Sequence, residues 1–227
     1  MIQCYNDFTR ALMRAGFSFA YSSNSEGIFS LLKFNWNNEP EGSALCWFSG
    51  DPDHDPASWC TRVLTERGDI AYAKLFFNKA GYITKEWYPY FLAARRQRSF
   101  DEAYADGLIS QYAKHVYDHL RAHGPTPAHE LKFSKADKSK YERAAVELQM
   151  GLFITICGDQ KKISRKGEEY GWSANVFRTV EEFWPREVFD RAAEIPPEEA
   201  EQAIAQRIFE LNPEANAKRL KKFIYGK

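Results

Sequence analysis

The sequence predicts an α+β protein that is mainly helical and carries small β-hairpins. Residues 108–186 show a helix, a short helix, a helix, a strand, a basic loop and a strand, and residues 1–100 contain a second helix-turn-helix-like pattern. This order predicts tandem winged-helix or helix-turn-helix modules, followed by C-terminal helices. We expect domains over 1–100 (a degenerate winged-helix-like module), 101–186 (a winged-helix domain) and 187–227 (helices that pack on the others).

The first two helices of the region 108–186 are predicted from apolar periodicity and from residues that begin or end helices. Apolar residues recur at the helical period over Leu108–His123, and Gly124 stops that helix. Thr126 followed by Pro127 predicts the N-cap and the first turn of a short helix that reaches Leu131.

The next helix carries the predicted binding face. Ser139 and Glu142 are spaced as a capping box. The apolar stripe consists of Tyr141, Ala145, Leu148 and Leu152, and the opposite face shows Lys140, Arg143 and Glu147. A β-rich run over 152–157, a basic loop and a second strand over 172–180 predict a hairpin. We expect Trp172 to anchor the base of this hairpin, and the alternative is that it stacks on a nucleic-acid base.

The rest of the chain is predicted more coarsely. The first part of the chain predicts a helix capped by Asn6 or Asp7 and ended by Gly16, a strand over 17–21, an apolar run over 27–34 that fits either helix or strand, and a buried strand over 45–48. Three further helices are predicted up to residue 96: one from Pro56, one over 70–79 that ends near Gly81, and one capped by Thr84 that runs to Arg96. Because of Pro89, the last of these helices starts late or kinks. A basic cluster, Arg95, Arg96 and Arg98, follows. Beyond 185 we expect helices, including one from Pro197 and a last one from Pro213.

Charge is segregated along a chain that is neutral as a whole, with 31 basic and 31 acidic residues. Residues 134–166 hold eight basic and four acidic side chains, whereas residues 187–214 hold two basic and eight acidic ones. A basic helix face beside a basic hairpin predicts binding of double-stranded or damaged DNA, because both elements can reach phosphates. The predicted contacts are Lys138, Lys140, Arg143, Lys161, Lys162, Arg165, Lys166, Arg95 and Arg96.

Two alternatives to DNA binding remain for this surface. The lysines can form an ordinary solvated face, and winged helices also serve as protein-interaction modules.

Other chemistry has weaker support. Asp51, Asp53, His54 and Asp55 form the densest cluster of ligand-type side chains, but Asp-Pro pairs are ordinary turn chemistry. His115, His119 and His123 recur every four residues, without the glutamate of a His-Glu-x-x-His motif, and a solvent-facing helix side explains them. There is no nucleotide-binding glycine loop and no serine-hydrolase elbow, so we expect neither cofactor nor metal.

The expected setting follows from composition. No apolar run is long enough to span a membrane, no secretory signal is visible, and four scattered cysteines favour reduced thiols. We therefore expect a cytoplasmic protein without a membrane partner. A monomer is favoured because no heptad pattern is visible.

Four segments resemble the AlkZ-related proteins, relatives of tandem winged-helix DNA glycosylases that act on alkylated and crosslinked bases. They are Tyr72–Thr84, Tyr88–Ala94, Tyr141–Gln149 and Glu182–Pro185, and the resemblance spans roughly 45–220. It implies a winged-helix architecture and a link to DNA repair.

The catalytic motif of those glycosylases is absent. The family resembles a Gln-x-Gln hydrolase, but no two glutamines of this chain are separated by one residue: they are Gln3, Gln97, Gln111, Gln149, Gln160, Gln202 and Gln206. Base excision needs a pocket for a flipped base and a group that activates water. We therefore expect a DNA-binding protein tied to repair that lacks this chemistry; the alternatives are a transcription regulator and a glycosylase that uses carboxylates.

Overall fold

The structure is a computed structural model, and it describes residues 1–21, 25–131, 134 and 136–226. Helices and strands are mixed throughout, which confirms the α+β class. The chain forms two compact units: unit 1 comprises residues 1–97 and 186–227, and unit 2 comprises residues 98–185. None of the helices in these described ranges is long and apolar enough to cross a membrane.

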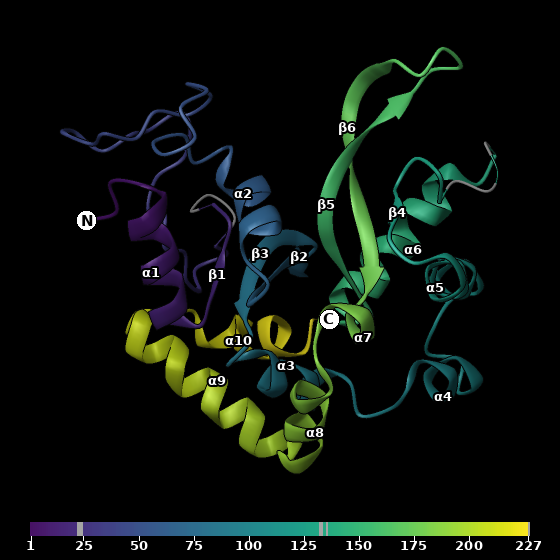
Figure 1. Ribbon diagram of the computed structural model, residues 1–227. Helices are drawn as coiled ribbons and strands as arrows, with labels where there is room; N and C mark the ends of the chain where they lie inside the picture. The colour runs from purple at the N-terminus through teal and green to yellow at the C-terminus, as the bar shows by residue number, and fades with distance from the viewer. Residues whose placement is uncertain (22–24, 132–133, 135, 227) are drawn as a thin grey trace. The chain divides into compact units, whose positions relative to one another are not determined.

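In unit 1, helices from both ends of the chain surround a small antiparallel sheet (Figure 1). Its sheet has β3 in the middle, between β1 and β2. Its elements are α1 (Tyr5–Ala15), β1 (Phe17–Phe19), α2 (Trp59–Glu66), β2 (Ile70–Phe76), β3 (Lys79–Thr84), α3 (Tyr88–Arg95), α8 (Arg186–Glu194), α9 (Pro197–Leu211) and α10 (Ala217–Tyr225).

The helix predicted over 70–79 is wrong, because this segment forms the hairpin of β2 and β3. Phe77 and Asn78 both have positive φ, at 51° and 61°, which is the geometry of a two-residue type I′ hairpin turn. Glycine usually occupies the second of these positions, where this chain has Asn78, so the sequence gives only a weak signal for a hairpin turn. Without that helix, the helix-turn-helix predicted in the first hundred residues is wrong as well.

Gly81 has a packing role instead of ending a helix. A Cβ at this position would lie 2.6 Å from the Phe76 ring and 2.9 Å from the Ser18 carbonyl oxygen. A glycine within a strand is typical of such a close approach.

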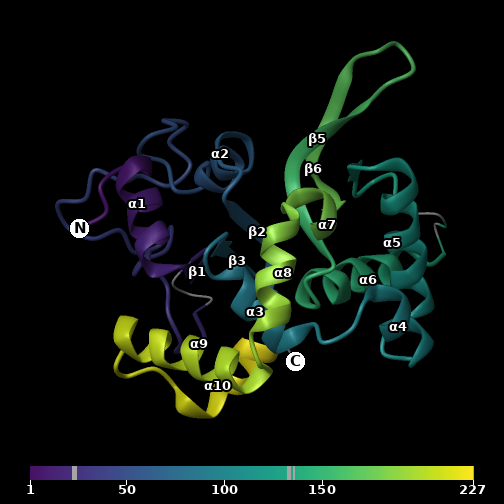
Figure 2. The ribbon, with the colours of Figure 1, turned by 60° about the horizontal axis from the view of Figure 1, so that its bottom comes forward.

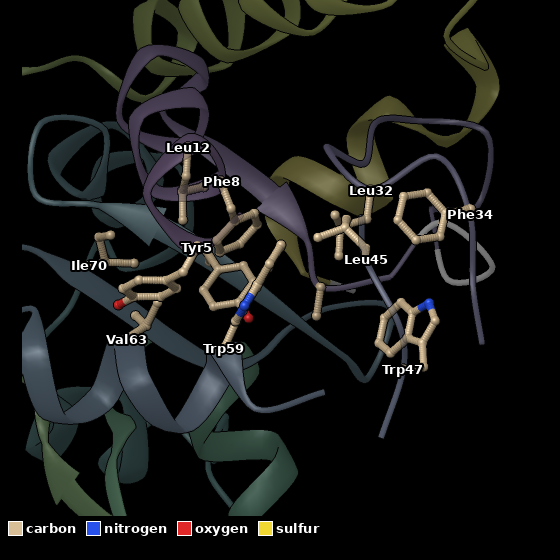
Figure 3. Packing of buried hydrophobic residues seen from close by; sticks show 12 residues of the cluster. Tyr5, Phe8, Leu12, Leu32, Phe34, Leu45, Trp47, Trp59, Val63 and Ile70 are labelled. Carbon is tan, nitrogen blue, oxygen red and sulfur yellow. The ribbon is translucent and has the colours of Figure 1, made fainter. Parts of the chain in front are cut away.

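A cluster of buried side chains fills unit 1 between α1, α2 and the sheet. Phe8 stacks on Trp59 at 5.0 Å between ring centroids, and Tyr82 meets Phe8 edge-on at 5.5 Å. Figure 3 labels ten members of the cluster: Tyr5, Phe8, Leu12, Leu32, Phe34, Leu45, Trp47, Trp59, Val63 and Ile70.

Several predicted boundaries in unit 1 are wrong. The first helix begins at Tyr5, ahead of the predicted caps Asn6 and Asp7. No strand forms over 45–48, although Leu45 and Trp47 are buried. The helix predicted from Pro56 begins at Trp59, and the one predicted from Pro213 begins at Ala217, where the Asn216 side chain caps it.

Other predictions for unit 1 are confirmed. Gly16 ends α1, the α3 helix starts late with Pro89 in its first turn, and α9 begins at Pro197. The apolar run 27–34 is neither helix nor regular strand and contributes one bridge between Ser30 and β1.

Unit 2 combines helices with a long β-hairpin (Figures 1 and 2). Its strand β6 lies between β5 and the short β4, and both pairings are antiparallel. Its elements are α4 (Phe100–Ala105), α5 (Gln111–His123), β4 (Thr126–Pro127), α6 (Lys138–Met150), β5 (Ile154–Ile163), β6 (Glu169–Thr179) and α7 (Val180–Phe183).

The helix predicted to start at Thr126 is wrong. Thr126 and Pro127 pair with Phe177 and Val176 as β4, and residues 128–130 form a turn. Proline fits here because it stands in a short edge strand, where no inward amide is required.

The capping box predicted at Ser139 is also wrong, because α6 already begins at Lys138. The capping box of this unit lies at Ser99 and Glu102 and opens α4, a helix that the sequence analysis missed. Of the predicted α6 stripe, Tyr141, Leu148 and Leu152 are buried, whereas Ala145 is only half-buried.

Candidate nucleic-acid interface

The β5–β6 hairpin is buried only at its base. Ile154, Thr155 and Ile156 are buried on β5, and Phe177 and Thr179 are buried on β6. Every residue of β5 from Asp159 onward is exposed, and both views show the far half of the hairpin extending beyond the helices of unit 2 (Figures 1 and 2). The far half of the hairpin, residues 159–175, is therefore a solvent-facing arm.

The turn at the end of this arm is held together by one serine. The Ser164 hydroxyl accepts hydrogen bonds from the backbone N–H of Lys166 (3.3 Å) and of Glu168 (3.1 Å). The Ser164 amide donates to the Glu168 carbonyl at 2.8 Å, and Gly167 takes the required positive φ of 82°. Arg165 and Lys166 therefore occupy the apex of a closed turn.

A bulge in β6 exposes Trp172. Gln160 pairs with Ala174 and Lys162 with Tyr170, so three residues of β6 oppose the single Lys161 of β5. Gly171 has φ 75°, a conformation that side-chain-bearing residues rarely adopt.

The predicted anchoring role of Trp172 is therefore wrong, because its side chain is 96% exposed. Ile163 and Tyr170, at 60% and 52%, are exposed on the same arm. Exposure of one large apolar side chain is common, and this arm has three. Tyr170 pairs with Lys162 and Ile163 with Glu169, so Tyr170 and Ile163 lie on opposite faces of the hairpin.

The cations of the arm differ in their partners. Lys161 forms an ion pair with Glu169 at 3.6 Å. Lys162, Arg165 and Lys166 are exposed, and among the described residues none of their charged groups has an ion-pair partner. These three side chains can take a phosphate partner without breaking an existing interaction.

The predicted cations of α6 are exposed but partly engaged. Lys140 lies 2.7 Å from Asp137 and donates to the Tyr112 hydroxyl at 2.9 Å; these hydrogen bonds raise the pKa of Lys140 well above its usual range. Lys138 lies 3.8 Å from Glu142, and Arg143 donates to the Ser139 carbonyl at 3.4 Å. No hydrogen bond or ion pair between described residues joins this group to the arm.

Arg95, also predicted to contact DNA, performs a structural task. Its Nε, Nη1 and Nη2 donate to the carbonyls of Ile224 (2.6 Å), Leu75 (2.8 Å) and Phe223 (2.7 Å). Burial lowers the pKa of the guanidinium, and the carbonyl oxygens surround the cation with acceptors. We therefore leave Arg95 out of the interface. Arg96 is half-buried.

Unit 1 has a basic hollow that the sequence analysis did not single out. It has a volume of about 1090 Å³, and its lining includes Arg10, Arg14, Lys33 and Arg67. Arg10 and Arg67 are paired with aspartates, whereas Arg14 and Lys33 are exposed, and no described residue forms an ion pair with either charged group. The hollow of unit 1 is therefore an alternative to the arm as a surface that can bind phosphates.

The loop 51–55 uses its carboxylates to organise the backbone. The buried Asp55 accepts from the amides of Phe48 (2.9 Å), Ala57 (2.9 Å) and Gly50 (3.3 Å). Asp51 binds the Asp53 amide and the His54 ring, and Asp53 pairs with Arg62. Among the described residues, no three His, Cys, Asp or Glu side chains are grouped to hold a metal ion.

Asp55→Ala is expected to lower the free energy of unfolding by about 2–3 kcal/mol, because three amides lose a charged acceptor. The control is Asp53→Ala, which removes an exposed ion pair and should cost under about 1 kcal/mol. Urea denaturation compares the two variants, and equal stabilities would contradict a structural role for Asp55.

The family relationship can now be stated from the whole chain. A family model described as AlkZ related matches residues 2–225. The chain belongs to the AlkZ-related family. This confirms the resemblance carried by the four sequence segments, and the match covers nearly the whole chain. Membership of this family suggests a relative of DNA repair glycosylases. No curated protein and no solved structure matches the chain.

Proposed function

We propose that unit 2 is a winged-helix module that binds duplex DNA, with the β5–β6 hairpin as its wing. The order α5, β4, α6, β5, β6, together with the pairing of β4 on β6, supports this assignment. In this arrangement α6 is the helix presented to a groove, and the wing contacts the neighbouring backbone.

The observation that carries the proposal is the set of three cations on the arm that have no ion-pair partner among the described residues. Lys162, Arg165 and Lys166 lie on the arm, whose β5 strand is exposed from Asp159 onward. A hairpin that served only to complete the fold would not need this extension. Membership of a family related to DNA repair glycosylases favours DNA as the polyanion.

Charge sets the expected strength and character of this binding. Four to six cations from the arm and α6 can neutralise a similar number of phosphates. Non-specific affinities of about 10⁻⁴–10⁻⁶ M at physiological salt are typical of this mode, with little sequence preference. Phosphate contacts fix the position of the protein on the duplex and leave the choice of site to other groups.

Catalysis by the family's glutamine pair is not part of the proposal. The chain lacks the Gln-x-Gln motif, and in the acidic loop 51–55 the Asp55 carboxylate already accepts hydrogen bonds from three backbone amides. We propose a DNA-binding role in repair without base release.

Arg165→Ala combined with Lys166→Ala is expected to reduce the slope of log affinity against log salt by about two units. Each lost phosphate contact removes about 0.9 unit on duplex DNA. Fluorescence anisotropy of a labelled duplex over a salt series gives the slope. Stability should stay within about 0.5 kcal/mol, since both side chains are exposed.

The matched control is Arg14→Ala combined with Lys33→Ala, which removes the same two side-chain types from the hollow of unit 1. This control should leave the slope unchanged. A reduced slope in the control with an unchanged slope in the arm variant would overturn the proposal. Base release is followed in the same samples with alkylated DNA, and release by the wild-type protein would overturn the non-catalytic part.

A further inference from the structure

The arm carries a feature that phosphate binding does not use. Trp172 is 96% exposed, and among the described residues its side chain has no hydrogen bond and no ring contact. Cations suffice for binding to the backbone of a duplex. A bare indole beside them indicates a second kind of contact.

The bulge directs this exposure. Three residues of β6 stand opposite one residue of β5, and Gly171, the first of the three, has a positive φ of 75°. The sequence Gly171-Trp172 thus places an aromatic ring outside the regular ladder.

The chemistry of a free indole identifies what it can bind. Aromatic side chains that stand beside cations stack on the faces of nucleic-acid bases. In intact duplex DNA those faces are covered by neighbouring base pairs, and uncovering one costs free energy. This cost is least where a base is already unpaired or its partner is missing.

We propose that Trp172 stacks on an unpaired base, so that the arm prefers duplex DNA containing such a base over intact duplex. This inference rests on the proposed DNA-binding function, since the cations of the arm bring the indole to the helix. It adds a substrate class: DNA with a local break in base stacking. The neighbouring cations, Lys162, Arg165 and Lys166, complement the phosphates that flank the break.

The test compares two labelled duplexes of equal length, one intact and one with a single unpaired adenine. Wild-type protein should bind the second about tenfold more tightly. Trp172→Ala should abolish this preference while leaving affinity for the intact duplex and its salt slope unchanged. Trp172→Phe should keep part of the preference because a smaller ring still stacks.

The control variant is Trp36→Ala, since Trp36 is also exposed, at 53%, but lies in unit 1. It should leave the preference intact. An unchanged preference in Trp172→Ala would overturn the inference even where the arm cations prove to bind duplex. Concentration-dependent self-association lost in Trp172→Ala would also overturn it, by assigning the indole to a contact between copies.

The failures of the two proposals are distinguishable. Absence of binding to both duplexes removes the DNA-binding function, and the inference with it. Binding to both duplexes with a normal salt slope and no preference removes the inference alone. Quenching of tryptophan fluorescence by the adenine duplex in wild type, absent in Trp172→Ala, would support stacking directly.

Discussion

Arg95→Met is expected to lower the free energy of unfolding by about 3–5 kcal/mol. The substitution keeps an unbranched apolar chain but removes the donors to the carbonyls of Leu75, Phe223 and Ile224. Each buried carbonyl left without a donor costs about 1–3 kcal/mol, and neighbouring costs are not fully additive. Chemical denaturation followed by circular dichroism measures the loss.

This substitution separates a structural arginine from a DNA contact. Arg143→Met is the control, because Arg143 is exposed on α6 and should change stability by no more than about 0.5 kcal/mol. The salt slope of DNA binding, measured where both variants are folded, should fall for Arg143→Met and stay constant for Arg95→Met. A stable Arg95→Met protein with a reduced slope would return Arg95 to the interface.

Helices with strong end signals were predictable from the sequence. Gly16 and Gly124 end α1 and α5, and Pro197 opens α9, as expected from their conformational preferences. The basic hairpin was predicted from β-rich runs around a polar loop, and its cations are exposed. These features are local, so short windows of sequence contain them.

Features that depend on tertiary packing were not predictable in the same way. The segment 70–76 has apolar residues at spacings that fit a helix or a strand that is buried on both faces, and only its pairing with β3 decides between them. The Phe77-Asn78 turn lacks the glycine that would have indicated a hairpin. Arg95 was grouped with Arg96 and Arg98 by charge alone, whereas its acceptors Phe223 and Ile224 lie more than a hundred residues along the chain.

The prediction for Trp172 was wrong because it relied on the usual burial of tryptophan, although a local signal of exposure was present. Tryptophan is highly buried on average, so an anchoring role was favoured. Gly171 was the local signal of a bulge, because a glycine inside a strand pattern often marks one. Combined with the exposed pattern of residues 169–173, it accounts for the free indole.

Phe223→Ala is expected to destabilise the protein by about 3–5 kcal/mol, the usual cost of removing a fully buried phenylalanine. Phe223 is 0% exposed and stacks on Phe76 with 4.1 Å between ring centroids. Phe17, Phe19 and Phe91 surround it at 5.9, 5.6 and 6.1 Å. Urea denaturation monitored by circular dichroism gives the loss.

This result would define the role of the C-terminal helices. Lys218→Ala is the control on the same helix, and its exposed side chain should contribute less than about 0.5 kcal/mol. A loss below about 1 kcal/mol for Phe223→Ala would mean that neighbouring side chains fill the cavity left by the ring, and that α10 contributes little to the core. A full loss would mean that the last helix completes the core of unit 1, because the ring of Phe223 and two of the three carbonyls that Arg95 binds, those of Phe223 and Ile224, belong to the same turn of α10.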